Sequence, residues 1–79
     1  MSSAADKLMQ NATLKALTVN GEPVETTADT LAALVESLGF AENAVATALN
    51  GAFVPRGQRG ATRLSAGDKV EIVAPRQGG

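Results

Sequence analysis

The chain has 79 residues, of which seven are Lys or Arg and eight are Asp or Glu, and it contains neither Cys nor His. The net charge of -1 argues against nucleic-acid binding, which needs a strong positive field. The missing Cys and His exclude disulfides, thiolate metal sites and thiol nucleophiles, and they remove the commonest general base.

The sequence predicts one domain between two short terminal segments. Residues 1–13 are polar and show no sustained apolar period, so we expect a disordered leader or a cloning remnant. Residues 14–74 carry the patterns of a single small domain, and residues 75–79 are expected to form a flexible tail. No apolar run approaches the roughly 20 residues that span a bilayer, and the N-terminus lacks the features of a signal peptide. We therefore expect a cytoplasmic protein without a membrane partner.

The first expected feature of the domain is a β-hairpin. Leu14–Val19 is a strand-like run, and Glu22–Thr27 is a second one in which Pro23 suits a strand start or an edge, because proline lacks an N–H. Asn20-Gly21 between the runs favours a type I′ turn, since both residues tolerate positive φ.

The pattern then changes to the period of a helix. Apolar side chains recur at i, i+3, i+4 and i+7 and form one stripe, which consists of Leu31, Leu34, Val35 and Leu38. Asp29 or Thr30 can cap the first N–H groups, and Gly39 stands where a left-handed residue would end the helix.

A second hairpin follows the helix. Ala44–Leu49 and Ala52–Pro55 are strand-like runs, and Asn50-Gly51 between them repeats the type I′ signal. The two hairpins therefore flank the helix in the chain.

The last part of the domain predicts one further strand. Arg56–Ala66 is a polar connection in which Leu64 is expected to anchor a one-turn helix. Gly67-Asp68 forms a turn, and Asp68–Val73 alternates so that Val70 and Ile72 lie on one face.

The expected order of elements is strand, strand, helix, strand, strand, strand. One helix long enough to cross a mixed sheet of four or five strands gives an α+β fold of the β-grasp (ubiquitin-like) type. The apolar stripe of the helix has to cover the concave face of the sheet, because no other layer is available to cover it.

The chemistry is expected at the end of the chain. The carboxylates are scattered, and the hydroxyl groups have no His beside them, so no catalytic constellation can be assembled and we expect no enzyme. After the last strand come Arg76, Gln77, Gly78 and Gly79. Gly has no Cβ, so such a tail can enter a tunnel too narrow for other residues, although a frayed terminus would look the same.

Short segments in a fixed order indicate the family. They are Asn20-Gly21-Glu22-Pro23, Thr30-Leu31-Ala32-Ala33-Leu34, Leu38-Gly39, Val45-Ala46-Thr47-Ala48-Leu49-Asn50-Gly51, Val54-Pro55-Arg56, Thr62-Arg63-Leu64, Gly67-Asp68-Lys69-Val70-Glu71-Ile72-Val73 and Gln77-Gly78-Gly79. Together, over Leu14 to Gly79, they resemble the thiamine-biosynthesis sulfur carriers (ThiS), a family of the ubiquitin-like superfamily. The segment before Leu14 departs from the usual family start, so nothing is carried over to it.

The resemblance implies a sulfur carrier that binds no cofactor or metal. It implies that an adenylating enzyme of the ubiquitin-activating type (ThiF-like) joins the Gly79 carboxylate to AMP from Mg-ATP, because a carboxylate is a poor acyl electrophile until it is activated. A persulfide from a cysteine desulfurase relay then displaces AMP and leaves a thiocarboxylate, from which thiazole synthase (ThiG-like) takes the sulfur. A carrier without a thiol can hold sulfur only on a carbonyl carbon, which agrees with Gly79. Gly78 would supply clearance.

Two groups of residues are candidates for docking a partner. Arg56, Arg59 and Arg63 place three cations in one connection that could meet an acidic face, although a solvated loop would look the same. Phe53 or Val54 could belong to an exposed apolar patch, although a Phe in a small domain is more often in the core. Arg76 and Gln77 are weaker candidates.

Three other functions remain open. The small subunit of molybdopterin synthase has the same fold and tail, but Val54-Pro55-Arg56 and Gln77-Gly78-Gly79 favour the thiamine carrier. A ubiquitin-like protein modifier would form isopeptide bonds to lysines. A β-grasp module that contacts RNA is disfavoured by the net charge, and it would have no need of a free Gly-Gly end.

Overall fold

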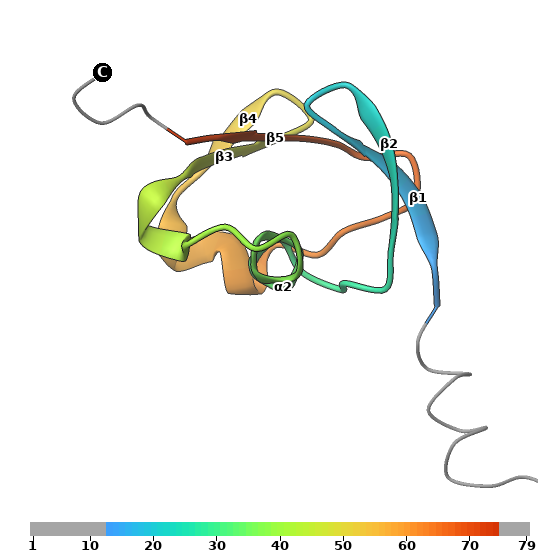
Figure 1. Ribbon diagram of the computed structural model, residues 1–79, viewed down its shortest axis with the longest axis horizontal. Helices are drawn as coiled ribbons and strands as arrows, with labels where there is room; N and C mark the ends of the chain where they lie inside the picture. Colours follow the sequence, from blue (N-terminus) through green and yellow to red (C-terminus); the bar gives the residue numbers. More distant parts are fainter. Residues whose placement is uncertain (1–12, 75–79) are drawn as a thin grey trace, which may run out of the picture.

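A computed structural model describes residues 13–74 of the chain (Figure 1). The expected α+β fold is confirmed, with a five-stranded mixed sheet and one main helix in the β-grasp arrangement. The elements in chain order are the strands and helices β1 (Lys15–Val19), β2 (Glu22–Thr26), α2 (Leu31–Ser37), η1 (Glu42–Ala44), β3 (Ala46–Leu49), β4 (Ala52–Val54), η2 (Arg56–Ala61) and β5 (Lys69–Val73), of which η1 and η2 are 3-10 helices.

The last strand of the chain lies in the middle of the sheet. The strand order is β2-β1-β5-β3-β4, so β5 has β1 on one side and β3 on the other. β1 and β5 are parallel, with Val19 opposite Val70, and the other neighbours are antiparallel. Figure 1 shows β5 crossing the top of the molecule above α2. The strand that precedes the tail is therefore held from two sides.

Both expected type I′ hairpins are confirmed. Asn20 and Gly21 have φ values of 53° and 84°, and Asn50 and Gly51 have φ values of 52° and 85°. Positive φ at both central residues defines this turn, whose twist matches that of the strands it joins.

The helix is bounded as the sequence predicts. The hydroxyl of Thr30 accepts a hydrogen bond from the backbone N–H of Ala33 at 3.1 Å, and Gly39 has a φ of 85°. Of the predicted stripe, Leu31, Leu34 and Val35 are buried, but Leu38 is 39% exposed. Leu38 follows the last helical residue, Ser37, and is only partly covered, because it lines a hollow with Val19 and Val24 of the first hairpin.

The core lies between the sheet and α2. It consists of Leu17, Val19, Leu31, Leu34, Val35, Val54, Leu64, Val70 and Ile72. Leu64 is buried as predicted, and its N–H donates to the Asp29 carbonyl at 2.9 Å. The helix predicted beside Leu64 is η2. It is longer than the predicted single turn and ends at Ala61, three residues before Leu64.

Several element boundaries differ from the predictions. β3 begins at Ala46 instead of Ala44, because Glu42–Ala44 forms η1, which the sequence pattern missed. β1, β2, β4 and β5 are each one residue shorter than predicted. In the described part of the chain, no helix is long and apolar enough to cross a membrane.

Candidate functional site

The predicted tail residues follow directly from the centre of the sheet. β5 ends at Val73, and Ala74 is the last described residue. Arg76, Gln77, Gly78 and Gly79 lie outside the described residues, so their predicted roles stay predictions. The structure shows how the strand before them is held.

Two asparagine side chains bind the two ends of β5. The amide of Asn20 accepts a hydrogen bond from the Ile72 N–H at 2.9 Å and donates to the Ile72 carbonyl at 3.0 Å. The amide of Asn50 accepts from the Lys69 N–H at 2.9 Å and donates to the Asp68 carboxylate at 3.1 Å. Sequence reasoning assigned these asparagines to turns and missed this second role.

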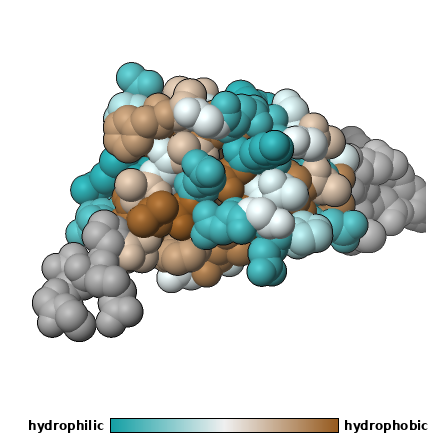
Figure 2. Space-filling view, turned by 90° about the horizontal axis from the view of Figure 1, so that it is seen from above, coloured by the Kyte–Doolittle hydropathy of each residue, from teal (hydrophilic) through white to brown (hydrophobic). Residues whose placement is uncertain are grey.

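The outer face of the sheet carries an apolar patch beside the end of β5. Strand partners share a face, and the partners Thr47, Val54 and Ile72 face the core, so their neighbours Ala46, Ala48, Phe53, Glu71 and Val73 face outward. We call the four apolar residues of this set, Ala46, Ala48, Phe53 and Val73, the outer patch; Glu71 lies opposite Ala48 beside it. Phe53 is 69% exposed and Val73 is 58% exposed. Figure 2 views this face from above and shows brown surface gathered toward the end of β5, with teal over much of the rest.

The two apolar docking candidates therefore separate. Phe53 is exposed in the outer patch, whereas Val54 is 8% exposed and belongs to the core. The prediction that Val54 could belong to an exposed patch is wrong, because alternate residues of a strand point to opposite faces and Val54 lies on the face that the core covers.

Arg59 is buried, and the prediction that it is a surface cation is wrong. Arg59 is 3% exposed. Its guanidinium donates to the Thr47 hydroxyl at 2.9 Å and to the carbonyls of Glu42 and Val45 at 2.7 Å each. The charge therefore ties η2 to η1 and to the start of β3 and is not available to a partner.

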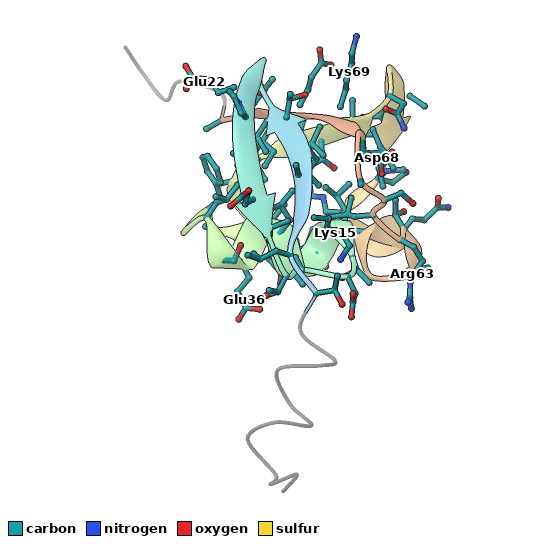
Figure 3. The ribbon with its side chains drawn as sticks, turned by 90° about the vertical axis from the view of Figure 1, so that its right-hand side faces the viewer. Lys15, Glu22, Glu36, Arg63, Asp68 and Lys69 are labelled. Atoms are coloured by element: carbon teal, nitrogen blue, oxygen red, sulfur yellow. The ribbon has the colours of Figure 1, made fainter. Side chains whose placement is uncertain are left out.

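The two remaining cations of the connection, Arg56 and Arg63, are exposed. Arg56 is 3.4 Å from the Glu42 carboxylate in a solvent-exposed ion pair. Figure 3 shows Arg63 pointing down from the layer beneath the sheet, while Lys69 points up from its outer side. Arg63 and the outer patch therefore do not form one continuous docking surface.

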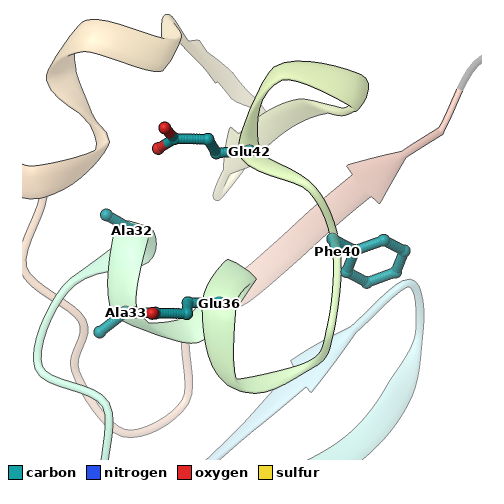
Figure 4. A pocket seen from close by; sticks show the side chains of 5 residues that line it. All are labelled: Ala32, Ala33, Glu36, Phe40 and Glu42. Carbon is teal, nitrogen blue, oxygen red and sulfur yellow. The ribbon is translucent and has the colours of Figure 1, made fainter.

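One hollow beside the helix has the size of a small-molecule site but lacks reactive groups. Its volume is about 420 Å³, and Figure 4 shows the residues that line it, Ala32, Ala33, Glu36, Phe40 and Glu42. The lining contains two carboxylates and no nucleophile with an adjacent base. Within residues 13–74, no cluster of three potential metal ligands occurs.

Comparison with known proteins identifies the family. The model of the ThiS family matches residues 7–79, which include the whole described domain and the Gly78-Gly79 end. The chain belongs to the ThiS family. The match also includes residues 7–13, which the sequence pattern placed before the domain. A search of curated proteins gives no significant match.

A solved structure supports the same ThiS assignment. The chain is similar to the crystal structure of thiamine biosynthesis protein ThiS from Geobacter metallireducens, with 34% sequence identity and a TM-score of 0.67. The alignment covers 81% of this chain and 99% of that one. ThiS family proteins are sulfur carriers and not enzymes, and the family implies partners of the ThiF and ThiG types.

Proposed function

We propose that this chain carries sulfur for thiazole formation in thiamine biosynthesis and that the carboxylate of Gly79 is the group that carries it. The observation that supports this most is the match to the ThiS family through residue 79, which includes Gln77-Gly78-Gly79. The sequence has no Cys, so a carbonyl carbon is the one place where this chain can hold sulfur covalently without a thiol.

The first step of the proposed reaction activates the carboxylate. A ubiquitin-activating-type enzyme (ThiF-like) binds Mg-ATP, and an oxygen of the Gly79 carboxylate attacks the α-phosphorus. Pyrophosphate leaves, and the chain ends in an acyl adenylate. This step is needed because an ionised carboxylate does not react as an acyl electrophile. The use of ATP agrees with the expected cytoplasmic location.

The second step exchanges oxygen for sulfur. The terminal sulfur of a persulfide, supplied by a cysteine desulfurase relay, attacks the acyl carbon, and AMP leaves with one of the original carboxylate oxygens. A thiol of the relay attacks the cysteine sulfur of the resulting acyl disulfide and forms a protein disulfide with it, and the S–S bond to the acyl sulfur breaks. This two-electron reduction releases the thiocarboxylate. A ThiG-like thiazole synthase then takes the sulfur.

The outer patch is the proposed docking surface for the activating enzyme. Phe53 and Val73 are large apolar side chains that the described domain leaves exposed on one face of the sheet, and contiguous apolar exposure is typical of contact sites. The patch ends at Val73, six positions before Gly79. Six residues reach roughly 20 Å when extended. An enzyme bound to the patch can therefore have its active site up to that distance from Val73 and still bind Gly79.

Intact mass tests the proposed function directly. The full chain is incubated with ATP, the activating enzyme and the sulfur relay. We expect a gain of about 16 Da, the exchange of one oxygen for one sulfur, in the C-terminal fragment. Formation of thiazole with thiazole synthase separates the thiamine pathway from molybdopterin synthesis. An unchanged mass contradicts the proposal, and a lysine-linked conjugate identifies a protein modifier instead.

A further inference from the structure

The side chain of Asn20 continues the pairing of β5 beyond the end of β1. The parallel ladder ends at the pair Val19 and Val70, and the Asn20 N–H donates to the Val70 carbonyl at 2.8 Å. The chain then turns away into the hairpin, so no backbone of β1 lies opposite Ile72. The Asn20 amide takes that place, with one bond to the N–H and one to the carbonyl of Ile72.

Asparagine is suited to this position by two properties at once. Its side-chain amide offers an acceptor and a donor, as a peptide group does, so it can replace a missing strand residue. It also tolerates positive φ, which the turn requires at Asn20. Aspartate also tolerates positive φ, but its ionised side chain has no hydrogen-bond donor. Glycine adopts positive φ freely but has no side-chain donor or acceptor.

We propose that Asn20 is a positioning residue for the reaction of the tail. By binding Ile72 on the side that β1 leaves open, Asn20 fixes the point and direction from which the chain leaves the sheet toward Gly79. This inference rests on the proposed function. It concerns a residue in a hairpin far from Gly79 in the sequence, and it assigns to that residue an effect on the rate at which the tail reacts.

Loss of the Asn20 amide leaves the end of β5 paired on one side alone. β3 still pairs with β5 through Val73, but the N–H and carbonyl of Ile72 lose their partner. An enzyme seated on the outer patch then meets a tail whose origin is less well fixed, and Gly79 spends less time in the active site. The expected fall in rate is roughly three- to tenfold, the factor that one net hydrogen bond represents.

Asn50 provides a matched control in the same chain. It occupies the same place in the second type I′ turn, with a φ of 52° against 53° for Asn20. It also makes two side-chain hydrogen bonds at the other end of β5: it accepts one from the Lys69 N–H and donates one to the carboxylate of Asp68, the residue before the strand. Asn20→Gly and Asn50→Gly therefore each remove two side-chain hydrogen bonds, and only the first acts at the end that leads to Gly79.

The test compares three variants with the wild-type full chain. Adenylation is followed by pyrophosphate release in a single turnover, with saturating ATP and a series of carrier concentrations. We expect Asn20→Gly to lower the rate at saturation by roughly three- to tenfold with the half-saturating concentration within about twofold of wild type. Asn50→Gly should keep the wild-type rate. Asn20→Asp keeps the acceptor for the Ile72 N–H, so its rate should lie between those of wild type and Asn20→Gly.

Amide hydrogen exchange of the free protein supplies a second readout. Exchange of the Ile72 N–H should accelerate in Asn20→Gly and stay unchanged in Asn50→Gly. A wild-type rate of adenylation in Asn20→Gly, or an equal fall in Asn50→Gly, overturns the positioning role while leaving the carrier function intact. Wild-type protein that is not adenylated at all overturns the carrier function, and the positioning role with it.

Discussion

Replacement of Arg59 by alanine should destabilise the domain far more than replacement of Arg56, three residues earlier in the same connection. The guanidinium of Arg59 is buried and bound to three acceptors that belong to η1 and to β3 or its approach. Arg56 makes one exposed ion pair with Glu42 at 3.4 Å. The two variants remove the same type of side chain from opposite environments.

The magnitude follows from the acceptors that Arg59→Ala leaves behind. The Thr47 hydroxyl keeps its hydrogen bond to the Val54 carbonyl at 2.9 Å, so the loss of the Arg59 donor costs little free energy at this residue. The part-buried carbonyls of Glu42 and Val45 lose a charged donor, and a fully buried group left unpaired would cost about 1–3 kcal/mol. Partial entry of water gives a net cost of roughly 2–4 kcal/mol. A domain of this length has a free energy of unfolding of roughly 4–12 kcal/mol, so the loss is a large share.

Urea unfolding followed by far-UV circular dichroism measures both variants, because the sequence has no Trp or Tyr for fluorescence. Arg56→Ala should change the free energy of unfolding by less than about 0.5 kcal/mol, as exposed ion pairs contribute little. Arg59→Lys should lie between Arg59→Ala and wild type, since an ammonium lacks the planar fork that reaches three acceptors. A loss below about 1 kcal/mol in Arg59→Ala, or equal losses at both positions, would refute the reasoning.

Three further predictions test the core, the outer patch and the tail. Leu34→Ala should lower the free energy of unfolding by roughly 2–5 kcal/mol, because Leu34 is fully buried, and a urea-measured loss below about 1 kcal/mol would contradict its place in the core. Phe53→Ser should raise the half-saturating carrier concentration for adenylation without a loss of stability. Leu14→Ser changes an exposed side chain outside the patch and should leave that concentration unchanged. Equal effects of the two substitutions would contradict a role of the outer patch in docking. Deletion of Gly79 should abolish thiazole formation with an unchanged unfolding curve, and normal thiazole formation would exclude Gly79 as the sulfur-bearing residue.

Local signals were sufficient to predict most of the fold. Asn20-Gly21 and Asn50-Gly51 predict their turns because few residue pairs adopt positive φ twice in succession. Thr30 and Gly39 predict the ends of the helix by equally local chemistry. These signals depend on neighbouring residues alone, and so they can be found in the sequence without knowledge of the fold.

Features that depend on distant contacts were not predictable in the same way. The local sequence, a cation among glycines, predicts that Arg59 is exposed. Nothing near it in the chain indicates that its guanidinium binds Thr47 and two backbone carbonyls. The pattern that places Leu38 on the apolar stripe is regular, but the helix ends before it. The second role of Asn20 requires the parallel pairing of β1 with β5, which brings together residues 52 positions apart.

Different parts of this small domain supply the core, the proposed docking surface and the strand that precedes the tail. Burial is concentrated between α2 and one face of the sheet, which leaves the opposite face free to display Phe53 and Val73. The central position of β5 also serves the proposed carrier. A tail that follows an edge strand would start from a strand that is paired on one side. β5 is paired with β3 on one side, and on the other side Asn20 extends its pairing as far as Ile72. If the proposed function is right, the Asn20 and Phe53 variants should differ in kind, with the first changing the rate at saturation and the second the concentration needed to reach it.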